Sequence, residues 1–100
     1  MKKWIKYKNG NTVGEKGNEN GIILDDEEYN SSGRITLEKC DEYYAITCGV
    51  YGAMVHTVFC SPKESTELFE KIKKDLGDFL SRETDEDEEA EFYDVFVKKY

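Results

Sequence analysis

The sequence has little of what enzymes and membrane proteins require. It contains a single histidine, His56, and it has no nucleophile motif, phosphate-binding loop or spaced set of metal ligands. No segment approaches the roughly 18 consecutive apolar residues of a membrane-spanning helix. No apolar run of signal-peptide length follows the lysines near Met1. These absences predict a cytoplasmic protein that is not attached to a membrane, and they favour binding without a cofactor or metal ion over catalysis.

The cysteines do not form a disulfide framework. Cys40, Cys48 and Cys60 are odd in number and have no recognised spacing. Without an export signal we expect a reducing compartment, in which they are buried small hydrophobic residues. The alternatives are a disulfide or a redox thiol. Cys60 is the best candidate for a redox thiol because it lies just before an expected helix, whose N-terminal dipole favours a thiolate.

Length and composition predict one small globular domain that spans residues 1–100. A chain of 100 residues has room for one modest core. Its 38% hydrophobic and 13% aromatic residues favour folding despite a charged fraction of 36%. Two segments fit a core poorly, namely a Gly/Asn-rich loop at 9–21 and an acidic segment at 83–91.

Alternation of apolar and polar residues predicts a β-meander. Tight turns at Asp41-Glu42 and Val50-Tyr51 would join the last three strands. The charges at 25–28 place the second strand at an edge of the sheet, where they discourage pairing with other molecules. The expected strands are 4–7, 22–29, 34–40, 43–49 and 53–60.

A long helix follows the last strand. Ser61 is expected to cap it, Pro62 suits its first position, and Glu64 completes a capping box. Apolar residues three or four apart continue to Ser81, so we expect an amphipathic helix over 62–81 that packs on the sheet. The C-terminal segment is a helix capped by Thr84 or, alternatively, a strand. The sequence thus predicts an α+β fold with a four- to five-stranded antiparallel sheet.

Two-residue turns also fix which side chains share a face. They place Glu38, Ala45 and His56 in one row, with Tyr43 on the same face and Tyr51 at the turn. A small ligand over Ala45 could bridge Glu38 and His56, which is a carboxylate and imidazole arrangement suited to acid-base chemistry. The helix would pack on the opposite face, which collects Ile35, Leu37, Tyr44, Ile46, Cys48, Val55 and Phe59.

The net charge of −8 argues against nucleic-acid binding, which needs a basic surface. Neither acidic run has the ligand spacing of a calcium-binding loop. The runs are therefore predicted patches for a basic protein partner, and they comprise Asp25, Asp26, Glu27, Glu28, Asp85, Glu86, Asp87, Glu88 and Glu89.

Three functional interpretations remain open at this point. The first is a small acidic domain that binds a basic protein, as a toxin-neutralising immunity protein or an inhibitor does. The second is a small-molecule binding domain or modest enzyme that uses the face with Glu38, Tyr43 and His56. The third is a homodimer that buries this face.

Overall fold

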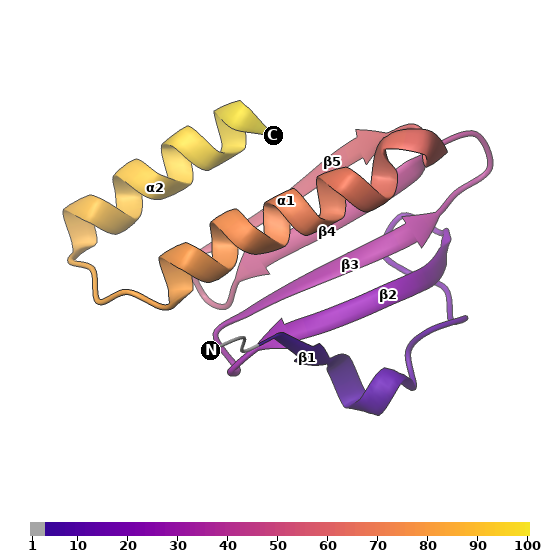
Figure 1. Ribbon diagram of the computed structural model, residues 1–100, viewed down its shortest axis with the longest axis horizontal. Coiled ribbons are helices and arrows are strands. Elements are labelled where there is room, and N and C mark those ends of the chain that lie inside the picture. Colours follow the sequence, from indigo (N-terminus) through magenta and orange to yellow (C-terminus); the bar gives the residue numbers. More distant parts are fainter. Residues whose placement is uncertain (1–3) are drawn as a thin grey trace.

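The computed structural model describes residues 4–100, in which two helices cover one side of a five-stranded sheet (Figure 1). Neighbouring strands are antiparallel and follow chain order, so the predicted α+β meander packed on a long helix is confirmed. A short 3₁₀ segment, η1 (Tyr7–Gly10), follows the first strand. The strands are β1 (Trp4–Lys6), β2 (Ile22–Tyr29), β3 (Gly33–Lys39), β4 (Tyr44–Val50) and β5 (Met54–Cys60), and the helices are α1 (Pro62–Leu80) and α2 (Glu86–Lys99).

The β3–β4 hairpin has the predicted register. Glu38 pairs with Ala45, and the N–H of Cys40 donates to the C=O of Tyr43 at 2.9 Å across the turn. This hairpin places the alternating apolar side chains of both strands on the face that meets the helices.

The β4–β5 hairpin differs from the prediction by three residues in register. Three residues separate the strands instead of two, and Gly52 among them adopts a φ of 77°. His56 therefore pairs with Cys48 and not with Ala45. Because side chains alternate between the faces, this slip turns every side chain of β5 to the face opposite the predicted one.

The core lies between the sheet and the helices. Val58 belongs to it, whereas Val55 and Phe59, expected there, are 78% and 57% exposed on the open face. At 25 cal/mol per Å², each fully buried side chain of this size contributes about 2 kcal/mol. The buried core residues are Ile35, Leu37, Ile46, Cys48, Val58, Phe69, Ile72, Leu76 and Phe96.

The predicted start of α1 is confirmed. The Oγ of Ser61 accepts a hydrogen bond from the N–H of Glu64 at 3.3 Å, and Pro62 occupies the first turn. The helix ends at Leu80, where the N–H of Ser81 donates to the C=O of Gly77. Within residues 4–100, neither helix combines the length and the apolarity needed to cross a membrane.

The C-terminal segment is a helix, so the strand alternative is wrong. Its cap is Asp85 and not Thr84, and Asp85 and Glu88 form a reciprocal capping box. Phe92 stacks on Phe79 of α1 at 3.9 Å between ring centroids. The acidic first turn and the lysines of the last turn both suit the helix dipole.

β2 is not an edge strand, contrary to the prediction. Its second half pairs with β1. Its first half bonds to the loop before it, since the N–H of Gly14 donates to the C=O of Ile23 and the N–H of Ile23 donates to the C=O of Glu15. The outer edge of β2 is thus occupied along most of its length.

Candidate functional site

The structure separates the two residues that the sequence analysis paired. Glu38 lies on the open face of the sheet, whereas the slip of β5 places His56 on the face that meets the helices. No ligand on one face can contact both side chains. The predicted row of Glu38, Ala45 and His56 is therefore wrong, and with it the acid-base pair.

Glu38 is enclosed by the Gly/Asn-rich loop. Its side chain is fully buried, and its Oε1 accepts hydrogen bonds from the N–H groups of Glu19 and Gly21 at 3.0 and 3.2 Å. Its Oε2 has no hydrogen-bond partner among the described residues. A Cβ on Gly17 would lie 2.3 Å from the Glu38 carboxyl carbon, so the loop lies directly on the carboxylate. Glu38 thus fixes the loop on the sheet.

His56 is covered by α2. Its ring packs edge-on against Phe96 with 6.2 Å between centroids. The Nε2 atom is buried and has no hydrogen-bond partner within residues 4–100. His56 therefore acts as a packing residue beneath the C-terminal helix.

The two predicted tyrosines lie at opposite ends of the sheet's open face. Tyr43 is 39% exposed and packs edge-on against Phe59 at 5.4 Å. Tyr51 lies in the β4–β5 turn, and its hydroxyl donates to Oε2 of Glu28 at 2.7 Å. Partial burial and this hydrogen bond to a carboxylate raise the pKa of Tyr51. Both tyrosines remain accessible for binding.

The acidic run in β2 is compensated within the fold. Asp25 lies 2.8 Å from Lys6, and Glu27 lies 2.8 Å from the buried ammonium of Lys73. Asp26 is fully buried and Glu27 is 5% exposed. The prediction of an acidic interaction patch at 25–28 is therefore wrong for Asp26 and Glu27, which partners cannot reach.

Arg34 is a site residue that the sequence analysis missed. Its Nε and Nη2 donate to the two carboxylate oxygens of Asp26 at 2.9 and 2.6 Å, and its guanidinium stacks 3.8 Å from the Tyr7 ring centroid. Thr12 and Thr36 also donate to Asp26. The ion pair between Arg34 and Asp26 follows from the pairing of β3 with β2. The spacing of the two residues in the sequence did not predict it.

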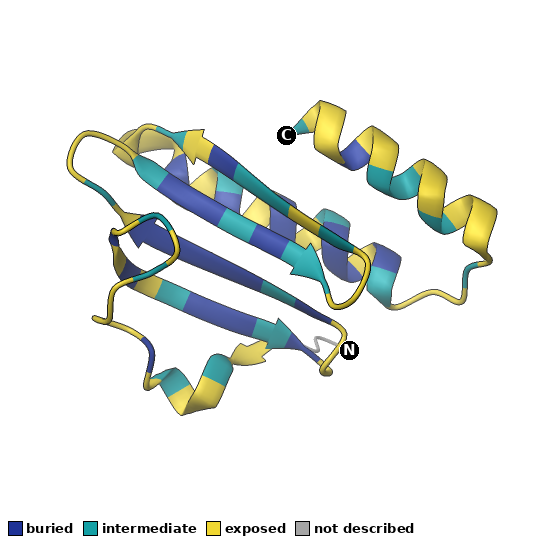
Figure 2. Cartoon of the chain, turned by 180° about the vertical axis from the view of Figure 1, so that it is seen from behind, coloured by how far each residue is buried: buried dark blue, intermediate teal, exposed yellow. Residues whose placement is uncertain are grey.

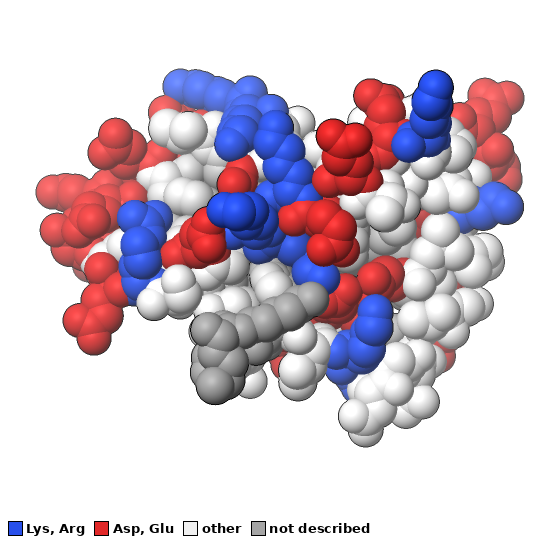
Figure 3. Space-filling view, in the orientation of Figure 1, with Lys and Arg blue, Asp and Glu red and all other residues white. Residues whose placement is uncertain are grey.

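The acidic residues of the C-terminal region are different because most of them are exposed and form no ion pair. Eight acidic residues lie between Glu83 and Asp94, with no lysine or arginine among them. Only Asp94 forms an ion pair with a described residue, Lys98. Figure 3 shows acidic side chains gathered at the end of the molecule where α2 begins. We call the exposed residues Asp85, Glu86, Asp87, Glu88 and Glu91, with the half-buried Glu89, the α2 acidic patch.

A pocket of about 370 Å³ adjoins the α2 acidic patch. Glu89 and Tyr93 of α2 line one side of the pocket. The rest is lined by residues that include Phe79 of α1, Arg82 just after α1, and Tyr51 in the β4–β5 turn. An aromatic wall beside a carboxylate suits the alkyl stem and charged head of a lysine or arginine.

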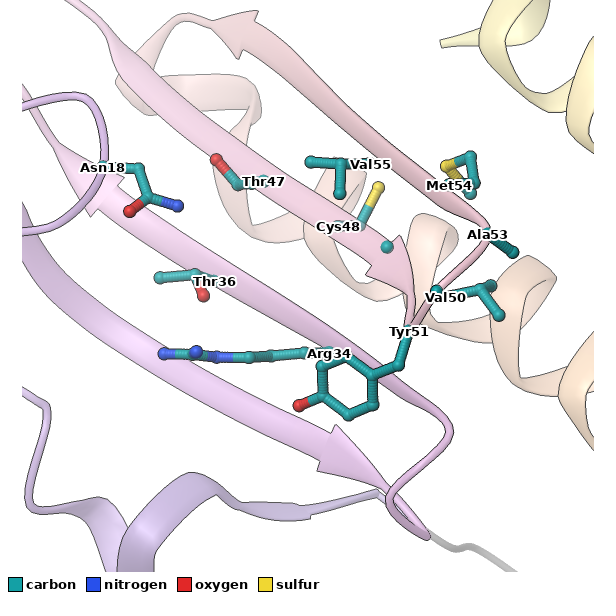
Figure 4. A pocket seen from close by; sticks show the side chains of 12 residues that line it. Asn18, Arg34, Thr36, Thr47, Cys48, Val50, Tyr51, Ala53, Met54 and Val55 are labelled. Carbon is teal, nitrogen blue, oxygen red and sulfur yellow. The ribbon is translucent and has the colours of Figure 1, made fainter.

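A second pocket, of about 440 Å³, lies on the open face of the sheet (Figure 4). Thr36, Thr47 and Arg34 project into it from β3 and β4, and Tyr51 and Val55 border it. The charge of Arg34 is matched by Asp26, so the pocket offers hydroxyl and apolar contacts to an uncharged ligand.

The cysteines are free and their thiols are held protonated. Burial raises the pKa of Cys48 to about 12, and burial with the nearby Glu64 raises that of Cys60. Burial and the nearby Glu38 carboxylate also raise the pKa of Cys40. The helix N-terminus thus does not activate Cys60. No group of three or more potential metal ligands occurs in the part of the chain that the structure describes.

Comparisons with known proteins do not assign a family, because no family model, curated protein or solved structure matches this chain.

Proposed function

We propose that this protein binds a basic protein in the cytoplasm through the α2 acidic patch, as a toxin-neutralising immunity protein or an inhibitor does. The observation that carries the proposal is the contrast between the two acidic runs. Asp25, Asp26 and Glu27 of the run in β2 form ion pairs with Lys6, Arg34 and Lys73. The α2 acidic patch forms no ion pair with any residue in 4–100.

Helix-start preference accounts for part of this patch. Asp85 and Glu88 cap α2, and acids in the first turn interact favourably with its dipole. Glu91 lies beyond the first turn, and Glu89 also lines the pocket beside Tyr93. These positions extend the negative surface past what the helix start requires, which supports recognition of a cationic partner.

The pocket beside the patch gives the binding a point of attachment. Tyr93 and Tyr51 are aromatic residues of the type enriched in protein interfaces. A lysine or arginine from the partner would place its stem against the Tyr93 ring and its charge near Glu89. The net charge of −8 opposes nucleic acid as an alternative partner.

A pull-down with the full chain from extracts of its own cells tests the proposal. The informative bait neutralises the patch but spares the capping residues, and it carries Glu86→Gln, Asp87→Asn, Glu89→Gln and Glu91→Gln. We expect the wild type to retain a basic protein that is released as ionic strength rises, since exposed charge pairs are screened beyond a Debye length of about 10 Å at 0.1 M salt. The neutralised bait should lose this protein.

A matched control changes the net charge equally at exposed acids elsewhere on the surface. It should bind like the wild type. Acidic partners alone, salt-insensitive retention, or equal loss by both baits would contradict the proposal. The control carries Glu15→Gln, Asp41→Asn, Glu42→Gln and Glu67→Gln.

The open-face pocket supports a second candidate function, the binding of a small uncharged ligand. It no longer involves His56, and it rests on Thr36, Thr47 and Tyr51 around a volume of about 440 Å³. NMR screening with small polar fragments tests it. Shifts confined to these residues, lost in Thr47→Val, would support the pocket, whereas shifts that persist in Thr47→Val would contradict it.

A further inference from the structure

β5 is an edge strand without the usual protection against pairing. It has β4 on one side and no strand on the other within residues 4–100. Its sequence from Met54 to Cys60 contains no charged residue and no proline, and its ladder with β4 has no bulge. Edge strands normally carry charged residues, prolines or bulges, because these block pairing with other chains. The contrast with β2, whose outer edge is occupied, leaves β5 as the long accessible edge.

The outward-pointing backbone groups of β5 belong to Val55, Thr57 and Phe59. At the β3–β4 turn, the N–H of Cys40 donates to the C=O of Tyr43. Hydrogen-bonded pairs alternate along an antiparallel ladder. With the unbroken registers of both hairpins, odd-numbered residues of β4 bond to β3 and even-numbered ones bond to β5. The odd-numbered residues of β5 thus direct their N–H and C=O groups away from the sheet.

Helix α2 extends past this edge. Both face-on views show it outside the outline of the sheet, beyond β5 (Figures 1 and 2). Phe96 anchors it over His56, and its exposed residues Ala90, Asp94 and Val97 lie on the flank turned away from α1 by helical spacing. A strand added beside β5 would lie beneath this flank. The helical layer is therefore wider than the sheet it covers.

We infer that β5 receives one extended segment of the partner as a sixth, antiparallel strand beneath α2. This inference rests on the proposed function, because it specifies how the basic partner binds. Apolar side chains of the segment would lie beside Val55 and Phe59 on the open face, where both are exposed. Its alternate side chains would lie on the side of α2, and charge complementarity with the α2 acidic patch makes these lysine or arginine.

A second copy of this chain fits the edge less well. Two β5 strands paired about a two-fold axis lie about 4.8 Å apart. Each copy of α2 projects past its own β5 on the same side of the sheet. Both copies carry a net charge of −8, so this pairing would bring two strongly negative molecules together against electrostatic repulsion. A single partner strand meets no such conflict.

The test uses a capped peptide of the length of β5 in which lysine alternates with valine, titrated into the full chain and followed by NMR. In the inferred pairing, the valines lie opposite Val55, Thr57 and Phe59 and bond to them. N-methylation of the valines should weaken binding by about tenfold or more, because it removes several hydrogen bonds. N-methylation of the lysines should change it less than about twofold, because their N–H groups face away from β5.

Variants of Thr57 provide the matched test on the protein. Thr57→Pro removes an outward N–H and leaves the bonds to β4, a position where proline is tolerated in edge strands. It should lose the peptide, whereas Thr57→Val should bind it like the wild type. Binding should also slow hydrogen exchange at the amides of Val55, Thr57 and Phe59.

Several outcomes would overturn strand addition. The first is equal binding of both N-methylated peptides, or binding unaffected by Thr57→Pro. If, in that case, neutralising the α2 acidic patch does abolish peptide binding, acidic recognition stands and the strand mode fails. Binding that depends on Thr57 but not on the patch or on salt would instead contradict the proposed function. Absence of binding at millimolar peptide, or a dimer with these amides protected in the free protein, also overturns the inference.

Discussion

Lys73 of α1 and Glu27 of β2 form an ion pair with 2.8 Å between Nζ and Oε1 and side-chain exposures of 6% and 7%. The indole N–H of Trp4 donates to the C=O of the same Lys73 at 3.2 Å. These contacts attach α1 to the β1–β2 side of the sheet, where Trp4 packs against the edge of the apolar core.

Removing one partner of this pair should be costly. Lys73→Met leaves a buried carboxylate that retains only the more distant Lys6 at 3.6 Å, so we expect a loss of about 3 kcal/mol in the free energy of unfolding. Combining it with Glu27→Leu should restore most of that loss. Urea denaturation measures both. Lys74→Met, at an exposed position, is the control. If Lys73→Met lowers the free energy of unfolding no more than Lys74→Met does, the expectation is refuted.

Gly17 and Glu38 should be energetically coupled. In Gly17→Ala the new methyl group displaces the Glu38 carboxylate from the N–H groups of Glu19 and Gly21. We expect a loss of about 1–3 kcal/mol, because buried polar groups lose their partners. In a Glu38→Ala background the same change should cost less than half as much. A double-mutant cycle by chemical denaturation measures the coupling, and additive losses would show that the loop does not depend on this contact.

His56 should be replaceable without loss of the fold. His56→Leu removes the buried Nε2 that lacks a partner among the described residues and keeps an apolar contact with Phe96. We expect the free energy of unfolding to rise by about 1 kcal/mol, the order of the desolvation cost of an unsatisfied group. His56→Ala should lower it instead, because it leaves a cavity. Thermal and urea unfolding distinguish the two, and destabilisation by leucine would indicate a polar role for the imidazole.

Acid should loosen the docking of α2. Partial burial opposes ionisation of Asp75, but hydrogen bonds from Lys99 and the Tyr100 hydroxyl outweigh it and hold its pKa below the ordinary 3.8. A lowered folded-state pKa contributes stability that is complete above pH 3.8 and is lost as the pH falls through the folded value. The effect should be under about 1 kcal/mol because the pair is partly exposed. Hydrogen exchange of α2 against pH measures it, and Asp75→Asn should abolish this component.

The sequence was sufficient for the elements whose signals are local. Ser61, Pro62 and Glu64 marked the start of α1, and the alternation through β3 and β4 gave their register. The C-terminal helix followed from its charge order, although Asp85 caps it one residue later than Thr84. Such signals act within a few residues and need no knowledge of the tertiary structure.

The register of β5 could not be obtained in this way. Gly49 and Gly52 both suit a turn, and Met54, Val58 and Cys60 make one face of the strand as apolar as Val55 and Phe59 make the other. The pattern thus did not specify which face is buried. In the folded chain the three-residue turn, in which Gly52 adopts a φ of 77°, sets the register, so that Gly49 pairs with Val55.

The charges of β2 were misread for a different reason. A run of four acidic residues resembles a solvent-exposed edge, but the partners Lys6, Arg34 and Lys73 lie in three separate elements. Their attraction becomes apparent only after strand pairing and helix packing bring them together. The candidate site therefore moved from β2 and His56 to α2 and the β5 edge, neither of which depends on a sequence motif.

The uneven placement of compensated and uncompensated acids also affects how the protein meets a partner. The uncompensated acids of α2 lie at its start, from Glu86 to Glu89, whereas Lys98 and Lys99 at its end are paired with Asp94 and Asp75. The electric field of an approaching cationic surface therefore rotates the protein before contact, so that the start of α2 faces that surface. Such steering raises the rate of association and falls with ionic strength, while the lifetime of the complex depends on short-range packing. For the proposed basic partner, capture and retention would thus depend on different parts of the molecule.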